Sequence, residues 1–200
     1  FVKNLAQPGG NITGIIGIGS ELITRRLQLL KEFIPKIPRA AVVTTGEPTD
    51  VMQYATVVSA ARALGIEVLQ VKVRSGSDLP HALALLRRWH ADAMYVLDAS
   101  LNFYNRRLLA EFAMENRVPM VAGALPYAEA GGLIGYGSDY EELSRSAATL
   151  VDKILHGMNP RDIPVTQSAK IQLAINMKTA KALGIKFPRS VLARADKVIE

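Results

Sequence analysis

Short apolar segments alternate with amphipathic segments along the first two thirds of the chain. Four apolar runs show no polar alternation, which is typical of strands buried on both faces. These runs are 13–18, 40–45, 93–99 and 118–123. A fifth run, 67–73, alternates in character and is expected near a sheet edge. Between the strands, the spacing of apolar positions predicts helices over 21–33, 51–64, 78–90 and 103–116.

The repeated order of strand and helix predicts an α/β fold, a three-layer doubly wound parallel sheet with right-handed crossovers. The expected strand order places 40–45 beside 93–99, with 67–73 outside them. The strand order then reverses between 40–45 and 93–99. Ligands of such sheets bind at the carboxyl ends of the strands at this point of reversal.

The alternation weakens after Gly131-Gly132. A strand is predicted at 133–137, a helix at 139–155, a linker around Pro160 and Pro164, a strand at 171–176 and a helical segment at 190–200. This pattern indicates a chain that leaves one domain, visits another and returns.

Composition narrows the possible functions. The 200 residues carry 24 Lys and Arg against 18 Asp and Glu, a net charge of +6, and include no cysteine. The arginine doublets, such as Arg25-Arg26 and Arg87-Arg88, fall on separate predicted helices, and no basic block appears. We therefore interpret them as a solvated basic surface and expect no nucleic-acid partner. No apolar run approaches the ~20 residues that a membrane span needs.

No catalytic, metal or cofactor motif is evident. The three histidines, His81, His90 and His156, lack metal-ligand spacing. Gly17-Ile18-Gly19-Ser20 and Gly135-Tyr136-Gly137-Ser138 match neither a nucleophile elbow nor a dinucleotide fingerprint. The sequence thus predicts neither an enzyme nor a bound metal or cofactor.

Polar and aromatic residues gather where the predicted strands end. The candidate ligand-binding residues are Thr45, Glu47, Asp50, Asp98, Ser100, Asn102, Gly123, Tyr127 and Tyr136. Glu47 or Asp98 is suited to an ammonium group, and Tyr127 or Tyr136 to stacking on an aromatic ligand. Helix capping is the alternative explanation for Asp50 and Ser100, because such residues are preferred at helix N-termini.

Three long motifs resemble those of a protein family. Gln7–Gly14 resembles the "PGGNITG" signature of ABC-transporter substrate-binding proteins of the tryptophan/tyrosine-uptake type. Gly131–Gly137 resembles the "GGLISYG" segment of this family. The segments 171–184 and 193–199 resemble its C-terminal end, "INLKTAKALG…LARADEVI". The loop Thr44-Thr45-Gly46-Glu47-Pro48 departs from the Ser/Asn-rich loop of amino-acid-binding members.

The resemblance implies a periplasmic-binding-protein type I fold of two α/β lobes that close on a ligand. Residues 1–14 would be a crossing segment, 15–130 the ligand-binding lobe, 131–163 a strand and helix of the other lobe, and 164–200 the return crossing with C-terminal elements. Because the chain opens on Phe1, we expect it to lack most of the first lobe. The helix 139–155 would then be exposed, displaced or buried by a second copy.

The implied function is the solute-binding component of an ABC uptake transporter. It would capture an amino acid or an aromatic or carboxylate compound between its lobes and deliver it to permease subunits. The implied location is the periplasm or, with an upstream lipid anchor, the extracellular surface. Membrane contact would come only through the permease or the anchor, and a homodimer would form through the helix 139–155. The alternative is the effector-binding domain of a transcription regulator, which shares the fold.

Overall fold

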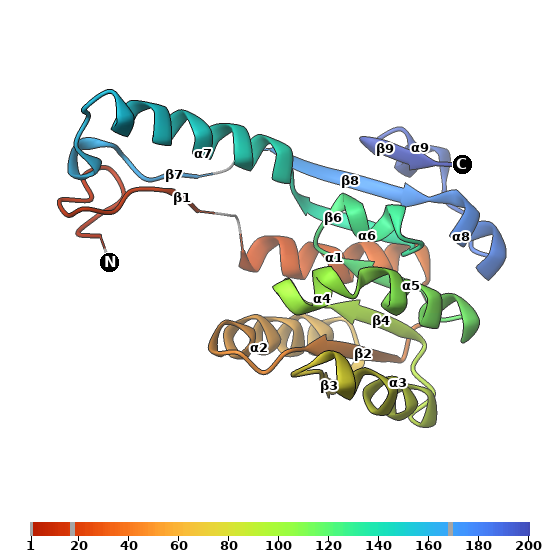
Figure 1. Ribbon diagram of the computed structural model, residues 1–200. Coiled ribbons are helices and arrows are strands. Elements are labelled where there is room, and N and C mark those ends of the chain that lie inside the picture. The colour runs from red at the N-terminus through yellow and green to blue at the C-terminus, as the bar shows by residue number, and fades with distance from the viewer. Residues whose placement is uncertain (1, 17–18, 168–169) are drawn as a thin grey trace. The chain divides into compact units, whose positions relative to one another are not determined.

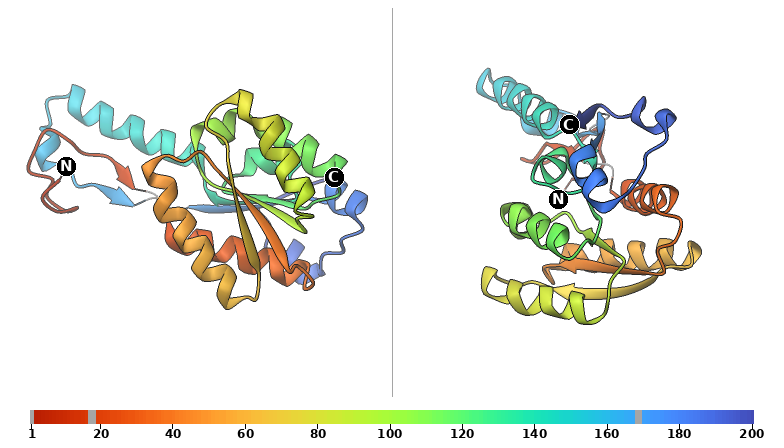
Figure 2. Two further views of the ribbon diagram at one scale, coloured as in Figure 1. Left: turned by 90° about the horizontal axis from the view of Figure 1, so that it is seen from below. Right: turned by 90° about the vertical axis from the view of Figure 1, so that its right-hand side faces the viewer.

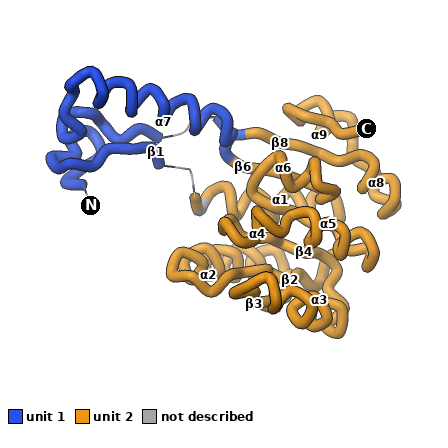
Figure 3. The backbone as a smooth tube through the Cα atoms, in the orientation of Figure 1, with its two compact units in different colours: residues 1–18, 138–171 blue, residues 19–137, 172–200 orange. Residues whose placement is uncertain are grey.

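The computed structural model describes residues 2–16, 19–167 and 170–200. The chain divides into two compact units (Figure 3). Unit 1 comprises 1–18 and 138–171, and unit 2 comprises 19–137 and 172–200.

Unit 2 is built on a seven-stranded sheet with the order β3-β2-β4-β5-β6-β8-β9 (Figure 1). Its strands are β2 (Arg39–Thr44), β3 (Glu67–Lys72), β4 (Ala93–Val96), β5 (Met120–Ala122), β6 (Ile134–Ser138), β8 (Ile171–Asn176) and β9 (Lys197–Ile199). The pairs from β3 through β6 are parallel, and so is the pair of β8 with β9.

The strand β8 runs antiparallel to β6. The amide of Asn176, at the end of β8, donates to the Leu133 carbonyl just before β6, whereas the Asp139 amide, just after β6, donates to the Lys170 carbonyl. The carboxyl end of β8 therefore lies at the edge of the sheet opposite the carboxyl ends of β2, β4, β5 and β6.

Helices cover both faces of this sheet (Figure 2). The helices of unit 2 are α1 (Ser20–Phe33), α2 (Pro48–Ala63), α3 (Leu79–Arg88), α4 (Ser100–Tyr104), α5 (Arg106–Glu115), α6 (Leu125–Glu129), α8 (Met177–Leu183) and α9 (Arg189–Leu192), with a 3₁₀ turn at Gly76–Asp78. Successive residues of β4 point to opposite faces: Tyr95 packs with α1 and α2, and Met94 packs with α3 and α5. The strand is buried throughout, which explains its unbroken apolar sequence.

The predicted doubly wound sheet is confirmed, and β2 and β4 are neighbours with β3 outside them. Five of the six residues of β3 are partly buried or exposed, as its alternating sequence indicates. The predicted helix 103–116 is two helices, α4 and α5, which join at Asn105. The helical prediction for 190–200 is wrong beyond Leu192, because 197–199 forms β9.

Two segments differ from the expected division of the chain. A strand was expected over 13–18, and its described part contains β1 (Ile15–Ile16), which pairs with β7 (Thr166–Gln167) outside the large sheet; Gly17 and Ile18 lie outside the described residues. The strand after Gly131-Gly132, assigned from the sequence to the other lobe, is β6, which pairs with β5 in the large sheet. The sequence of β6, Ile-Gly-Tyr-Gly-Ser, did not indicate which sheet this strand joins.

Unit 1 contains β1, β7, a 3₁₀ turn (Pro160–Asp162) and α7 (Tyr140–Leu155). The Asp139 side chain caps α7 by accepting from the amides of Glu141 and Glu142, at 3.0 and 3.2 Å. No residue of α7 is buried. Its apolar face, including Leu143, Ala147 and Val151, lines an open groove together with 13–15.

No helix within the described part of the chain is both long and apolar enough to span a membrane.

Candidate functional site

The candidate site lies at the carboxyl ends of β2, β4 and β5, where the strand order of unit 2 reverses. Three short connections leave the sheet here: Thr45–Glu47 leads into α2, Asp98-Ala99 into α4, and Gly123-Ala124 into α6. Parallel strands place these connections at one edge, which is the position of ligands in doubly wound sheets.

The centre of this edge is an ion pair between Arg26 of α1 and Asp98. The Arg26 Nη2 atom lies 2.8 Å from Asp98 Oδ2, and the exposed fractions of the two side chains are 2% and 33%. The Arg26 Nε donates to the Tyr136 carbonyl at 2.6 Å, and Nη1 donates to the Tyr95 hydroxyl at 3.4 Å. The guanidinium is thus fixed on three sides, and it holds the carboxylate while a third of that side chain stays open.

The electrostatics of this cluster keep it charged. Burial by itself would lower the pKa of Arg26, but Tyr95 and Asp98 outweigh this effect and raise the pKa above its ordinary value. Burial raises the pKa of Tyr95 to about 12, although Arg26 acts in the opposite direction. At neutral pH, Arg26 is therefore a cation and Tyr95 a neutral hydroxyl, which donates to the Ile23 carbonyl at 3.2 Å.

Two glycines make room for the ion pair. A Cβ atom on Gly123 would collide with Asp98 Oδ1 and would crowd Arg26 Nη2. A Cβ atom on Gly137 would collide with the Gly123 carbonyl oxygen. Only residues without a side chain allow Asp98 and Arg26 to meet in this position.

The loop after β2 is organised by Asp50. Its Oδ2 accepts from the Thr45 amide, from the Thr45 hydroxyl at 2.8 Å and from the Gly46 amide at 3.0 Å. Both Thr45 and Asp50 are buried. Asp50 stabilises the loop before α2, although its side chain makes none of the capping bonds expected of a helix N-cap.

Asn102 and Gln53 connect the loops that follow β2 and β4. The Asn102 Nδ2 donates to the carbonyls of Leu97 and Val43, at 3.0 and 3.5 Å, and Gln53 Nε2 donates to the Asp98 carbonyl at 3.5 Å. Asn102 is buried, so its side chain stabilises the loops from below and is not part of the exposed surface of this edge.

The structure thus separates the nine residues predicted from the sequence. Asp98, Gly123 and the Tyr136 carbonyl meet around Arg26. Glu47 and Ser100 are exposed at the starts of α2 and α4. Tyr127 is a core residue whose ring packs edge-on against Phe103, with centroids 5.9 Å apart.

Four buried side-chain oxygens near this edge have no hydrogen-bond partner within the described structure. They are Asp50 Oδ1, Gln53 Oε1, Asp98 Oδ1 and Asn102 Oδ1. Buried polar atoms are nearly always paired in native proteins, and all four of these are acceptors. The edge is therefore rich in acceptors and suited to a ligand that brings donors.

Sequence reasoning missed Arg26 and Tyr95. Arg26 was interpreted as half of a solvated doublet, yet helical spacing places it on the apolar face of α1 with Leu22, Leu30 and Phe33. A charge on a buried face requires a partner of opposite charge, so this spacing was the available signal. No group of three His, Asp or Glu side chains among the described residues is arranged to hold a metal ion.

Comparisons with known proteins connect this geometry to a family. The model of a family described as ABC transporter substrate binding protein matches residues 1–199. A tyrosine-binding protein of Clostridioides difficile is 30% identical over 187 residues, which are 93% of this chain and 53% of that protein. The chain therefore spans about half the length of this curated relative.

Solved structures show the same fold. A conserved domain protein from Vibrio cholerae is 28% identical, with a TM-score of 0.88 over 98% of this chain and 66% of that one. An ABC domain from Streptococcus pneumonia, solved with L-Trp, is 24% identical, with a TM-score of 0.86 over 99% of this chain and 68% of that one.

Proposed function

Because the chain belongs to the ABC transporter substrate-binding protein family, we propose that it captures a small solute for an uptake transporter and delivers it to a membrane permease. The solute binds at the carboxyl ends of β2, β4 and β5 in unit 2. The protein works outside the cytoplasm, where importers of this kind collect solutes. It binds its solute without chemical change.

The proposed solute is an amino acid whose ammonium group contacts Asp98. A carboxylate accepts several hydrogen bonds, and the Arg26 ion pair uses only one side of the Asp98 group. Asp98 Oδ1 has no hydrogen-bond partner within the described structure and is an acceptor, as an ammonium with three donors requires. A relative named as a tyrosine-binding protein supports an aromatic amino acid.

The observation that carries this proposal is Asp98 at the reversal point: a buried arginine fixes its carboxylate, while one third of the side chain is exposed. Asp50, at the same edge, differs from Asp98 because its carboxylate accepts hydrogen bonds from Thr45 and Gly46 of its own loop.

Isothermal titration with L-tyrosine and L-tryptophan tests the proposal. We expect Asp98→Asn to weaken binding by about tenfold or more, because the ammonium loses a charged acceptor. We expect N-acetyl-L-tyrosine, which has no ammonium, not to bind. Asp92→Asn is the matched control, because Asp92 has the same exposed fraction, 33%, and also pairs with an arginine, Arg39.

Three results would contradict the proposal. If Asp92→Asn weakened amino-acid binding as much as Asp98→Asn, loss of any arginine–aspartate ion pair would be enough to reduce affinity. Unchanged affinity in Asp98→Asn would remove Asp98 from the site. Failure of every amino acid to bind would overturn the proposed solute class.

A further inference from the structure

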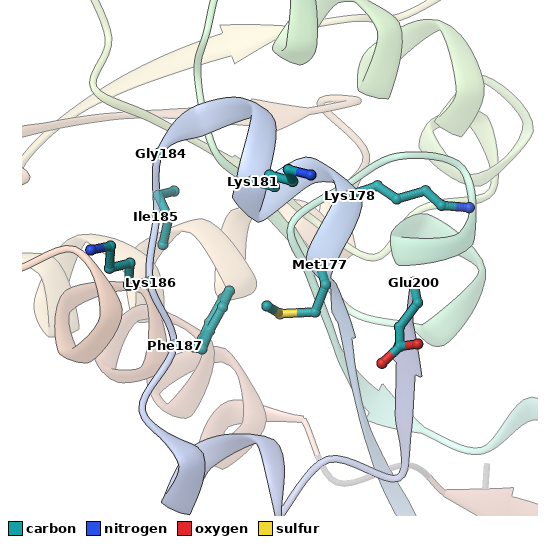
Figure 4. A pocket seen from close by; sticks show the side chains of 8 residues that line it. All are labelled: Met177, Lys178, Lys181, Gly184, Ile185, Lys186, Phe187 and Glu200. Atoms are coloured by element: carbon teal, nitrogen blue, oxygen red, sulfur yellow. The ribbon is translucent and has the colours of Figure 1, made fainter.

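A cavity of about 730 Å³ opens in unit 2 between α8, the following segment and the end of β9. Its lining residues are Met177, Lys178, Lys181, Gly184, Ile185, Lys186, Phe187 and Glu200 (Figure 4). The volume lies within the range of small-molecule pockets, about 300–1,000 Å³.

This cavity is separate from the candidate solute site. It lies beside α8, which follows β8, and β8 runs antiparallel to β6. The cavity therefore lies toward the edge of the sheet opposite Asp98. A ligand here makes no contact with the carboxyl ends of β2 and β4, so this inference goes beyond the proposed function.

The interior of the cavity is apolar. Met177, Ile185 and Phe187 are partly buried and pack on the core of unit 2, and Phe187 packs edge-on against Phe33 with centroids 4.7 Å apart. In Figure 4 the Met177 and Phe187 side chains occupy the centre of the view, between α8 and the segment that follows it. An apolar ligand group placed here would remove these side chains from water.

The rim of the cavity is cationic. Lys178, Lys181 and Lys186 are exposed, and among the described residues none of them has an ion-pair or hydrogen-bond partner. In Figure 4 the Lys181 side chain lies above Met177, and the amino groups of Lys178 and Lys186 point outward on opposite sides of the view. Residues 172–200 contain six Lys and Arg against two Asp and Glu, so this segment carries +4 of the chain's net charge of +6.

We propose that this cavity binds a small amphipathic anion. The aryl or alkyl body of the ligand packs on Met177, Ile185 and Phe187, and its carboxylate, sulfonate or phosphate group contacts the rim lysines. Glu200 is the one acidic group in the lining, so the anion binds on the side of the lysines.

Methionine-methyl NMR with naphthalene-2-sulfonate as the probe tests this site directly. The chain has six methionines, and Met177→Leu assigns the Met177 signal by its disappearance. We expect the probe to shift the Met177 signal and to leave Met94 and Met120, which are buried in the core, unchanged. The neutral analogue 2-naphthol is expected to bind about tenfold or more weakly, because it lacks the charge.

Substitutions identify the charge requirement. Replacing Lys178, Lys181 and Lys186 by Gln together should weaken probe binding by about tenfold or more. The control replaces Lys3, Lys72 and Lys153 by Gln. These lysines are exposed outside the cavity, and their replacement removes the same net charge. Met177→Glu, which places a carboxylate in the cavity, should abolish binding, whereas Met177→Leu should retain it as measured by titration.

Equal weakening by the control triple variant would overturn the proposal, because general charge attraction would then explain binding. Equal affinity for 2-naphthol would overturn the anion requirement. Displacement of the probe by L-tyrosine, or loss of its binding in Asp98→Asn, would place it at the candidate solute site instead. An unshifted Met177 signal at saturating probe would also reject the cavity.

Discussion

At the residue scale, Arg26 shows how a single buried charge organises the candidate site. Its neighbour Arg25 points to the surface, with 34% of its side chain exposed, whereas 2% of Arg26 is exposed. The prediction of a solvated doublet is correct for Arg25 and wrong for Arg26. Sequence adjacency suggested one role, but residues one position apart on a helix face different directions.

Removing Arg26 should destabilise unit 2. Arg26→Met leaves Asp98 without its ion-pair partner and removes the hydrogen bond that the Tyr95 hydroxyl accepts from Arg26. Breaking a buried pair costs about 3–5 kcal/mol. Because Asp98 is one-third exposed, we expect a smaller loss in the free energy of unfolding, about 2 kcal/mol. Urea unfolding of Arg26→Met, Asp98→Asn and the double variant measures it.

The double variant is the control for this interpretation. If the Arg26 effect comes from an uncompensated carboxylate, adding Asp98→Asn should recover part of the lost stability. Additive losses in the double variant would show that the two side chains act independently.

Gly123 sets the space for the Asp98 carboxylate, and Gly123→Ala should displace it. The new methyl group would overlap Asp98 Oδ1 and crowd Arg26, so the carboxylate must move. We expect amino-acid affinity to fall by about tenfold or more, because small displacements of a binding group are costly. Gly76→Ala, at a position with open space and no left-handed backbone, is the control. Unchanged affinity in Gly123→Ala would mean that amino-acid binding does not depend on the present position of the Asp98 carboxylate.

At the scale of elements, the sequence predicted the strands that carry the site but not all of its residues. Continuous apolar runs identified β2 and β4, and the expected order placed them side by side. The nine site candidates followed from one rule, that ligands bind after strands. This rule does not distinguish Asp98, which faces Arg26, from Asp50, which binds its own loop. Local sequence does not specify the orientation of a side chain set by tertiary contacts.

The first turn of α7 depends on Asp139, and its substitution should loosen that turn. Asp139→Ala removes the acceptor of the Glu141 and Glu142 amides and should cost about 1 kcal/mol. Asp139→Asn keeps a capping oxygen and loses only the ion pair with Lys170, so its effect should be smaller. The increase in hydrogen-exchange rate of the Glu141 and Glu142 amides measures the effect of each substitution. Asp152→Asn, at an exposed acid later in α7, is the control.

The same cap gives a pH dependence with a defined sign. The hydrogen bond from Lys170 lowers the pKa of Asp139 below its ordinary value, so protons bind the unfolded carboxylate more readily. The stabilisation is present above about pH 4 and is lost as the pH falls through the lowered value. The protection of the first-turn amides, relative to their intrinsic exchange rate at each pH, should therefore fall at acid pH in the parent protein. An equal fall in protection in Asp139→Asn would contradict this assignment.

At the scale of the whole molecule, the two units differ in how they are stabilised. Among the described residues, the buried apolar side chains belong to unit 2 with two exceptions, Pro8 and Ile163 of unit 1. The resemblance predicted that the helix 139–155 would be exposed, displaced or buried by a second copy, and no residue of α7 is buried within the chain. Helical periodicity identified this helix, but its spacing alone does not show whether the apolar face has a partner.

The helices α1 and α7 allow this difference to be measured. They have similar lengths, 14 and 16 residues, but Leu27 and Leu30 of α1 are fully buried whereas α7 has no buried residue. Isolated helices shorter than ~12–15 residues are marginal in water, so tertiary packing decides protection. We expect α7 amides to exchange about 1,000-fold faster than those of α1, a difference of about 4 kcal/mol in opening free energy.

Native-state hydrogen exchange in increasing urea tests this expectation. Amides of α1 and β4 should open only with global unfolding of unit 2, and those of α7 should exchange at low urea without it. Ile163→Ala should accelerate exchange in unit 1 further and leave β4 protection unchanged. If α1 and α7 share one opening free energy, the chain unfolds as a single cooperative unit. The burial of side chains within each unit would then not determine its stability.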